Sequence, residues 1–281
     1  MLSIKEYIHG YFSERQDQLE VHYPGIKVDR ILSEFCEFYK LKDSEVYIDV
    51  KREFFELLNQ GFPLEYIQKN AYFYRSNFFV DQSVLIPRYE TEILVEDSIQ
   101  YIDKHYKEGF KVAEVGTGSF CIGLSIAIDI ERPIYIWGGD IDQSALEVSQ
   151  INLFRLKSKI NRKTQIDLVC SDRLDKAVEE FDFIVSNPPY IKIVLDRDGV
   201  HEQTNKYEPH IALYLEDDIF IKWFEDFFLE VSGKLKPDGA FFMEGHEDSL
   251  EKLKTIAGKY FKKAELKNDY TNRKRFLYAY K

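Results

Sequence analysis

The hydrophobic positions in the first part of the chain repeat at the spacing of α-helices. Ser3 and Glu6 have the spacing of a capping box, and they precede a stripe at Ile4, Tyr7, Ile8, Tyr11 and Phe12. A second stripe lies at Val28, Ile31, Leu32, Phe35 and Tyr39. A third helix is expected over residues 45–59, before Gly61 and Pro63. These patterns predict a small all-helical N-terminal domain over residues 1–70.

The pattern changes near residue 70. Residues 72–86 are rich in Tyr, Phe and Val around the polar pair Ser76-Asn77, which predicts a β-hairpin linker over residues 71–88. From Lys111 onward, short apolar runs alternate with helical patterns, as in a parallel sheet with crossover helices. The expected strands cover residues 111–115, 134–137, 166–169, 181–186, 240–244, 262–267 and 275–280. We therefore expect an α/β domain over residues 89–281.

Composition narrows the class of protein. The chain has 281 residues, of which 44% are hydrophobic, enough to bury a large core. A formal net charge of −11 argues against broad adhesion to nucleic acid, because that affinity comes largely from Lys and Arg. Cys36, Cys121 and Cys170 have no paired spacing, so we expect neither disulfides nor a metal site. Without a signal sequence or an apolar run long enough for a membrane span, the sequence indicates a cytoplasmic protein.

A glycine-rich turn follows the first strand of the predicted sheet. The stretch KVAEVGTGSFCIGLSIAI reads as strand, turn and helix, and such a turn places a ligand at the carboxyl end of the strand. Gly116 and Gly118 allow a tight turn and a close approach of the backbone to that ligand. A nicotinamide fingerprint would need a third glycine where Cys121 stands, so a pyrophosphate ligand is disfavoured.

Two carboxylates accompany this turn. Asp140 ends the next strand, 22 positions after Gly118, where a carboxylate can accept hydrogen bonds from ribose hydroxyls. Glu114 suits a cationic or amine-bearing ligand better than a phosphate. S-adenosylmethionine has both features, because it carries ribose hydroxyls and is cationic. The alternative is that Glu114 and Asp140 cap helices or turns.

The fourth predicted strand ends in Asn187-Pro188-Pro189-Tyr190. Two prolines make the chain leave the sheet stiffly with carbonyls unpaired, and Asn187 adds a side-chain carbonyl. Two fixed acceptors can hold both hydrogens of a planar NH₂ group, and Tyr190 can stack on it. The alternative is a rigid turn with a helix-capping Asn. Transfer of a sulfonium methyl group depends mainly on alignment and charge, which agrees with the lack of a recognisable nucleophile–base motif in the sequence.

These motifs belong to a wider resemblance. The chain resembles the HemK/PrmC family of peptide chain release factor glutamine methyltransferases over nearly its full length. The matching stretches are GFPLEYI, SVLIPRYETEILVE, EVGTGS, GGDID, SDRL, IVSNPPYI and YEPHIAL. The resemblance implies a seven-stranded Rossmann-like class I methyltransferase sheet behind a helical domain that helps to dock the release factor. It also implies methylation of the Gln in the Gly-Gly-Gln loop of that factor, with S-adenosyl-L-homocysteine as the product.

The resemblance assigns roles to residues at matching positions. It implies that the cofactor is bound by Glu114, Gly116, Thr117, Gly118, Ser119, Phe120, Asp140, Ile141, Asp172, Arg173 and Asn187. Arg173 is expected beside the adenine. It implies that the substrate is bound by Arg88, Glu90, Thr91, Asn187, Pro188, Pro189, Tyr190, Glu208 and Pro209, with Asn187 to Tyr190 as the catalytic motif. We expect release factors as the partners of this protein, and we expect the protein to be a monomer.

The chain departs from the family pattern at three places. Phe120 stands where the family commonly has glycine, Tyr89 where it has proline, and Tyr214-Leu215 where it has a glycine pair. We expect Phe120 to pack under the loop. The alternatives are a ribosomal-protein glutamine methyltransferase, a nucleic-acid adenine methyltransferase that shares NPPY, and a binding module whose cofactor site is blocked by Phe120. The segment of residues 192–210 is long and charged, so we expect it to act as a lid that closes on the substrate.

Overall fold

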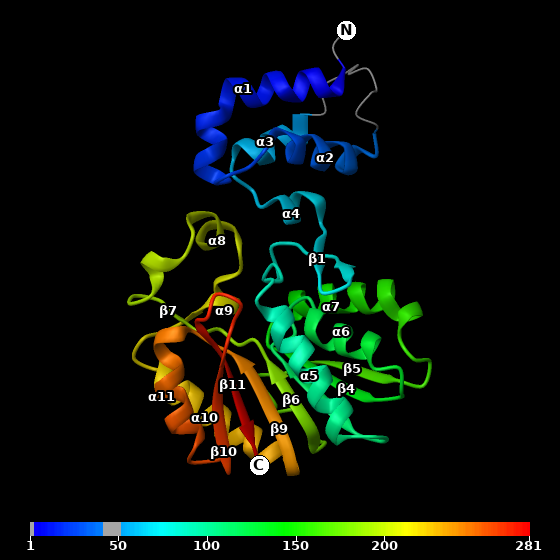
Figure 1. Ribbon diagram of the computed structural model, residues 1–281, viewed down its shortest axis with the longest axis vertical. Helices are drawn as coiled ribbons and strands as arrows, with labels where there is room; N and C mark the ends of the chain where they lie inside the picture. Colours follow the sequence, from blue (N-terminus) through cyan, green and yellow to red (C-terminus); the bar gives the residue numbers. More distant parts are fainter. Residues whose placement is uncertain (1–2, 42–51) are drawn as a thin grey trace.

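The computed structural model describes residues 3–41 and 52–281. A helical part at the N-terminus stands apart from a larger domain built on a seven-stranded sheet (Figure 1). The sheet has the order β10-β11-β9-β6-β3-β4-β5, and β11 runs antiparallel to both of its neighbours. Its strands are β3 (Lys111–Val115), β4 (Tyr135–Asp140), β5 (Gln165–Cys170), β6 (Phe181–Ser186), β9 (Leu235–Glu244), β10 (Lys263–Asn268) and β11 (Lys274–Tyr280). The predicted α/β class with a helical N-terminal region is confirmed.

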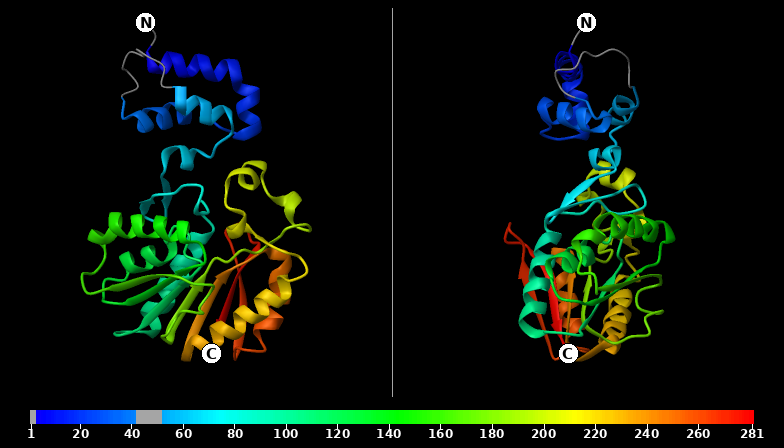
Figure 2. Two further views of the ribbon diagram at one scale, coloured as in Figure 1. Left: turned by 180° about the vertical axis from the view of Figure 1, so that it is seen from behind. Right: turned by 90° about the vertical axis from the view of Figure 1, so that its right-hand side faces the viewer.

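Helices cover both faces of the sheet (Figure 2). One face carries α5 (Thr91–His105), α6 (Cys121–Asp129) and α7 (Gln143–Leu156), followed by the short helix η1 (Lys157–Lys159). The other face carries α10 (Phe220–Lys234) and α11 (Glu247–Ala257). Successive strand residues alternate between the two cores: Val112 packs toward α5 and α6, whereas Ala113 packs toward α10. Burial on both faces explains why these strands read as continuous apolar runs.

Every predicted strand of the sheet is present, and the largest boundary difference is at β9. This strand begins at Leu235, five positions before the predicted start at residue 240. The early part contains Pro237 and Gly239, which are depleted in strands, so the apolar pattern becomes readable only after them. The pairing with β6 is irregular there, between Phe181 and Phe183.

The N-terminal part is built from α1 (Ile4–His22), α2 (Val28–Tyr39), α3 (Arg52–Asn59) and α4 (Leu64–Gln68). The predicted capping box is confirmed: Ser3 Oγ accepts a hydrogen bond from Glu6 N (3.2 Å), and the Glu6 carboxylate accepts one from Ser3 N (2.8 Å). Of the predicted third helix, residues 45–51 lie outside the described residues. The five-residue helix α4 was not predicted, because a single turn shows no periodicity.

The predicted hairpin is present, but its turn lies elsewhere. β1 (Ala71–Phe73) pairs with β2 (Ser76–Phe78), so Ser76-Asn77 lies in a strand and the turn is Tyr74-Arg75. Tyr74 has a left-handed backbone (φ 54°), which polar composition alone does not reveal. Both turn residues contact Asp129 at the end of α6, through the Tyr74 hydroxyl (3.0 Å) and the Arg75 guanidinium (3.0 Å). The turn therefore lies where its residues contact Asp129, two positions before the polar pair on which the prediction was based.

The segment after NPPY lies between the helical part and the sheet (Figure 1). It contains β7 (Ile191–Lys192), η2 (Arg197–Gly199), α8 (Glu202–Tyr207), α9 (His210–Leu213) and β8 (Tyr214–Leu215). Gln203 Nε2 donates a hydrogen bond to Gly61 O (2.8 Å), and the Tyr207 ring packs on Phe62 with 4.4 Å between ring centroids. The segment therefore bridges the two parts, and its movement as a lid stays a prediction.

Candidate active site

A cavity of about 240 Å³ lies at the edge of the sheet where β3, β4, β5 and β6 end. In an open α/β sheet this carboxyl edge is the usual place for a ligand. Fourteen of the predicted site residues line the cavity: Arg88, Thr91, Glu114, Gly116, Thr117, Gly118, Ser119, Asp140, Ile141, Asp172, Arg173, Asn187, Pro188 and Pro189. The glycine turn, the acidic strand end and the NPPY motif, which are separate in sequence, therefore face one space.

The glycine turn is held close to β4. Gly116 N and Thr117 N both donate to Gly139 O, at 2.8 and 3.1 Å. Gly116 and Gly118 have positive φ values (71° and 50°), which glycine adopts without strain. A Cβ placed on either glycine would meet no atom of the described residues within 4 Å. The turn therefore needs glycine for its backbone conformation and leaves open space beside it for a ligand.

Asp140 supports the turn and faces the cavity. Its carboxylate accepts hydrogen bonds from Gly118 N (2.8 Å) and Asp142 N (3.0 Å). Burial raises the pKa of Asp140, and these backbone hydrogen bonds act in the opposite direction. Each carboxylate oxygen can accept more than one hydrogen bond, so Asp140 retains acceptor capacity toward the cavity.

Glu114 is the more deeply buried carboxylate, with 1% of its surface exposed. It accepts a hydrogen bond from Gly123 N (2.7 Å) in the first turn of α6. Burial raises the pKa of Glu114 well above its usual range, and the charge of Asp140 raises it further. Glu114 and Asp140 thus both accept backbone hydrogen bonds at a helix start or a turn, as the capping alternative expected. Both also line the cavity. A buried carboxylate and a half-buried one beside the same cavity favour a cationic ligand.

Phe120 requires a correction, because its side chain does not line the cavity. The ring is fully buried in the core beneath the turn. It lies so close to Gly123 that a Cβ on this glycine would collide with it, and a Cβ on Gly138 would meet it in tight contact. The expectation that Phe120 packs under the loop is confirmed, whereas contact of its side chain with a cofactor is not supported.

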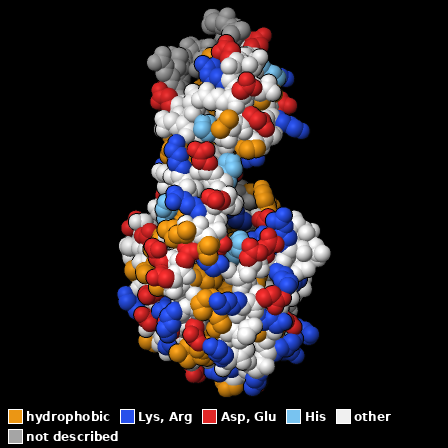
Figure 3. All heavy atoms as spheres, turned by 90° about the vertical axis from the view of Figure 1, so that its left-hand side faces the viewer, with side chains coloured by type: hydrophobic (Ala, Val, Ile, Leu, Met, Phe, Trp, Pro, Cys, Tyr) orange, Lys and Arg blue, Asp and Glu red, His pale blue; other side chains and the backbone are white. Residues whose placement is uncertain are grey.

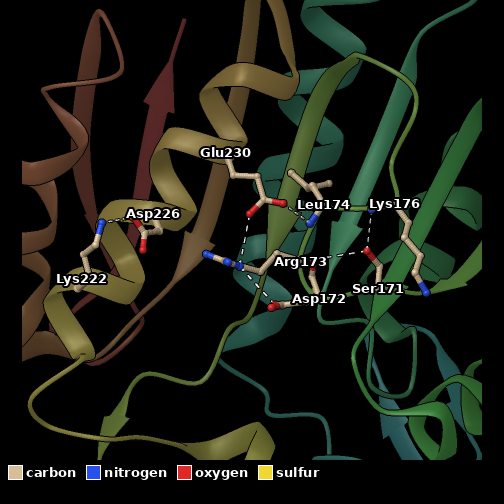
Figure 4. Close-up of polar contacts among 8 residues, drawn as sticks. All are labelled: Ser171, Asp172, Arg173, Leu174, Lys176, Lys222, Asp226 and Glu230. Carbon is tan, nitrogen blue, oxygen red and sulfur yellow. Dashed lines mark hydrogen bonds and ion pairs between the residues drawn. The ribbon is translucent and has the colours of Figure 1, made fainter.

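Arg173 lines the cavity from the turn after β5, and Figure 4 shows its polar contacts. Its Nε is 3.4 Å from an oxygen of Asp172 and 3.4 Å from an oxygen of Glu230 on α10. Glu230 also accepts a hydrogen bond from Leu174 N (2.7 Å), so α10 holds this turn. The guanidinium lies 5.8 Å from the ring centroid of Trp223, which also lines the cavity. Arg173 and Trp223 together offer planar groups against which a base can stack.

In the NPPY motif, Asn187, Pro188 and Pro189 line the cavity and Tyr190 does not. The Tyr190 hydroxyl instead donates to Glu244 Oε1 (2.8 Å). Burial raises the pKa of Tyr190 well above its usual range. The Tyr190 ring packs against the core formed with α10, so the structure shows a structural contact for it, and stacking on the substrate amide stays a prediction.

The predicted substrate residues divide in two groups. Arg88 and Thr91 line the cavity, whereas Glu90, Glu208 and Pro209 do not. Glu208, which is 4% exposed, forms an ion pair with Arg88 and accepts a hydrogen bond from Ile86 N (3.0 Å). Glu208 thus contributes by holding Arg88 at the cavity.

Sequence reasoning missed several residues of the site. Ile211, Ala212, Tyr214 and Trp223 line the cavity, and Glu244 accepts hydrogen bonds from the cavity residue Thr91 and from Tyr190. The available signal for Glu244 was its position, because it is an acidic residue at the end of a buried strand, like Asp140. The apolar residues carried no comparable signal.

Residues 3–41 and 52–281 contain no group of three or more His, Cys, Asp or Glu side chains placed to hold a metal ion. Within the same residues, each helix is too short or too polar to cross a bilayer.

Solved structures resemble this fold. The chain aligns with the hMettl16 catalytic domain in complex with an MAT2A 3′UTR hairpin, with a TM-score of 0.54 and 14% identity over 91% of this chain and 93% of that one. It also aligns with the Thermus thermophilus 16S rRNA N2 G1207 methyltransferase in complex with AdoMet and guanosine, with a TM-score of 0.50 and 16% identity over 75% of this chain and 49% of that one. At these identities the likeness concerns the fold alone.

Sequence comparisons are more specific. The family model of the methyltransferase small domain matches residues 91–203. The release factor glutamine methyltransferase of Clostridium acetobutylicum is 31% identical over 266 residues, which cover 90% of this chain and 87% of that protein. The release factor glutamine methyltransferase of Streptococcus pneumoniae is 35% identical over 75% of this chain and 72% of that protein. With this similarity and a cavity built from the matching motifs, the chain belongs to the release factor glutamine methyltransferase family.

Proposed function

We propose that this enzyme transfers a methyl group from S-adenosyl-L-methionine to the side-chain amide nitrogen of the Gln in the Gly-Gly-Gln loop of peptide chain release factors. One observation carries the proposal: Asn187 and the prolines after it share a single cavity with the glycine turn and with the carboxylates of Glu114 and Asp140. Relatives named for this activity support it. S-adenosyl-L-methionine supplies an electrophilic methyl group when it is bound.

The cavity residues divide the work. Glu114 and Asp140 favour the positive charge of the cofactor, and Asp140 retains lone pairs for ribose hydroxyls. Arg173 and Trp223 offer a stacking surface for the adenine. Asn187 Oδ1 and the Pro188 carbonyl would accept the two hydrogens of the glutamine amide. Accepting both hydrogens directs the nitrogen lone pair toward the methyl group, and water can take the proton released after transfer.

The test is a methylation assay with purified components. We expect the enzyme to add one methyl group to the Gln of the Gly-Gly-Gln peptide of a release factor, measured by tandem mass spectrometry. Asn187→Ala should lower kcat about 100-fold, as removal of one aligned polar contact does elsewhere, while isothermal titration shows little change in cofactor affinity. An unchanged rate would remove Asn187 from the mechanism.

Other acceptors serve as competing outcomes of the same assay. Methylation of a ribosomal protein but of no release factor would overturn the proposed substrate, as would methylation of DNA or RNA alone. The net charge of −11 makes a nucleic acid the less favoured acceptor. On the face drawn in Figure 3, acidic and basic side chains are interspersed, whereas a nucleic-acid surface would gather basic ones.

A further inference from the structure

Glu244 is a buried carboxylate that does not line the cavity, although it lies behind the residues that do. It ends β9 at the same edge of the sheet, and 1% of its surface is exposed. Its Oε2 accepts a hydrogen bond from Thr91 Oγ1 (2.6 Å), and its Oε1 accepts one from Tyr190 Oη (2.8 Å). A buried carboxylate is costly, so its position between two motifs requires an explanation.

The hydrogen bonds of this group have a fixed direction. The hydroxyls of Thr91 and Tyr190 both donate to Glu244, as they do whenever this carboxylate is ionised, because an ionised carboxylate only accepts. The single hydroxyl hydrogen of Thr91 is thereby used, and Thr91 Oγ1 can only accept from its other neighbour. That neighbour is Asn187 Nδ2, at 3.3 Å. The NH₂ of Asn187 must therefore face Thr91, which turns its carbonyl oxygen away from Thr91.

We propose that Glu244 and Thr91 are positioning residues that set the side-chain amide orientation of Asn187, so that its carbonyl oxygen faces the cavity as a hydrogen-bond acceptor. The inference deepens the proposed function, because only an acceptor at this position can hold the NH₂ group of a glutamine. With the amide flipped, Asn187 would present donors to donors. Tyr190 contributes by fixing the far end of NPPY to the same carboxylate.

The charges around Glu244 bear on its ionisation. The charges of Arg275 on β11 and of Glu90 before α5 act in opposite directions on the pKa of Glu244. Burial raises the pKa of Glu244, while the hydrogen bonds from Thr91 and Tyr190 and the charge of Arg275 favour the carboxylate. Arg275 also pairs with Asp269 (3.3 Å), which holds it in place.

Thr91→Val tests the relay, because valine keeps the shape of threonine and removes its hydroxyl. We expect kcat to fall about tenfold, the effect of losing roughly one hydrogen bond, with KM for the release factor and cofactor affinity within about twofold. Thr91→Ser, which retains the hydroxyl, should restore most of kcat. Ser98→Ala is the matched control, since it removes a buried hydroxyl of the same helix that donates to Leu94 O. A wild-type kcat in folded Thr91→Val, or a rise in KM alone, would overturn the proposal.

Glu244→Gln gives a second variant of nearly equal size. Its amide offers one acceptor in place of two, so either Thr91 or Tyr190 loses its partner. We expect a kcat decrease similar to that of Thr91→Val, and little further loss in the double variant, because both residues act through Asn187. Full additivity of the two decreases would contradict a shared path.

A substrate-free readout separates this inference from the proposed function. In protein labelled with ¹⁵N-asparagine, the Asn187 side-chain NH₂ is assigned by its loss in Asn187→Asp. We expect slow solvent exchange of one of its protons in the wild type and in Thr91→Ser, and fast exchange in Thr91→Val. If no release factor is methylated, the proposed function fails while this readout still tests the amide orientation. Equal exchange in all three proteins would overturn the orientation itself.

Discussion

At the scale of single residues, the cavity combines the buried carboxylate of Glu114 with the half-buried one of Asp140, and removing either from water is costly. Glu114 and Asp140 both accept backbone hydrogen bonds, which offset part of the desolvation penalty. Their raised pKa values show that a penalty remains in the cofactor-free protein. A cationic ligand would offset it, so the residues that weaken the free protein are those that favour binding.

The variant Glu114→Gln should reveal this penalty through the pH dependence of its stability. The pKa of Glu114 is raised in the folded state, so the unfolded chain releases this proton at lower pH than the folded chain does. The free energy of unfolding of the wild type therefore falls as pH rises from the unfolded pKa toward the folded one, and glutamine lacks this loss. We expect Glu114→Gln to gain stability relative to the wild type as pH rises, measured by urea unfolding at about pH 5 and about pH 8.

The same variant should bind S-adenosylmethionine about tenfold more weakly, measured by isothermal titration, because it lacks the charge. Gln should still accept from Gly123 N, so the start of α6 is expected to stay in place. A stability difference that is constant with pH would contradict an ionised, destabilised Glu114.

Single residues were predictable where a motif surrounds them. Asp140 and Asn187 follow apolar strands, and the carboxyl ends of such strands meet at one edge of the sheet. Glu244 follows a strand too, but its role depends on Thr91, 153 positions away. Nothing in a single sequence indicates that this carboxylate and this hydroxyl meet. The sequence likewise does not indicate that the rings of Phe120 and Tyr190 lie outside the cavity lining, since which side of the turn a ring occupies is decided by packing.

At the scale of elements, the residue before α6 combines a strained backbone conformation with a buried side chain. Phe120 precedes the helix with φ 62° and ψ 27°, a left-handed conformation that disfavours side chains with a Cβ. Its ring fills space beneath the glycine turn. Core packing therefore retains a large residue where the backbone alone would favour glycine.

Phe120→Gly should lower stability, because the loss of the ring outweighs the relief of strain. Removing a buried Phe side chain costs about 3 to 5 kcal/mol, and relieving a left-handed residue returns about 1 kcal/mol. We expect a net loss of about 3 kcal/mol in urea unfolding. The exposed Lys40 also has a positive φ (54°), so Lys40→Gly relieves strain without opening a core and should not destabilise. A gain in cofactor affinity for Phe120→Gly at unchanged stability would show that the ring obstructs the site.

Elements were predictable in proportion to their length and burial. The strands of the sheet pack on both faces, so their apolar runs were clear. The short helices α4, α8 and α9 were missed, since a few residues show no period. The hairpin turn was misplaced because contacts of Tyr74 and Arg75 with Asp129 decide its position.

At the scale of the whole molecule, the helical part is joined to the sheet domain twice. The chain itself passes through α4 and the hairpin, and α8 makes a second, non-covalent connection to residues 60–62 (Figure 1). These contacts join residues more than 140 positions apart, so no local pattern predicted them. The domain boundaries at residues 70 and 88 remain our proposal. Helix α8 connects the parts that these boundaries separate.

The connection through α8 gives a prediction for substrate docking. Tyr207 packs on Phe62 and its hydroxyl donates to Gln60 O, while the neighbouring Glu208 holds Arg88 at the cavity. Tyr207→Ala should loosen the helical part relative to the cavity and raise KM for the release factor about fivefold, the effect of losing roughly 1 kcal/mol of aromatic contact. We expect kcat and cofactor affinity to change little, because no cavity residue is removed.

Two further variants identify the cause of the KM change. Tyr207→Phe keeps the ring and loses the hydroxyl, so its KM should lie between those of the wild type and Tyr207→Ala. Tyr72→Ala, at an exposed tyrosine of β1 with 58% of its surface accessible, should leave KM unchanged. A lower kcat with unchanged KM in Tyr207→Ala would instead assign the helix to the chemical step. Equal KM values in all four proteins would mean that the position of the helical part over the cavity does not affect binding of the release factor, and that α8 is only a structural support.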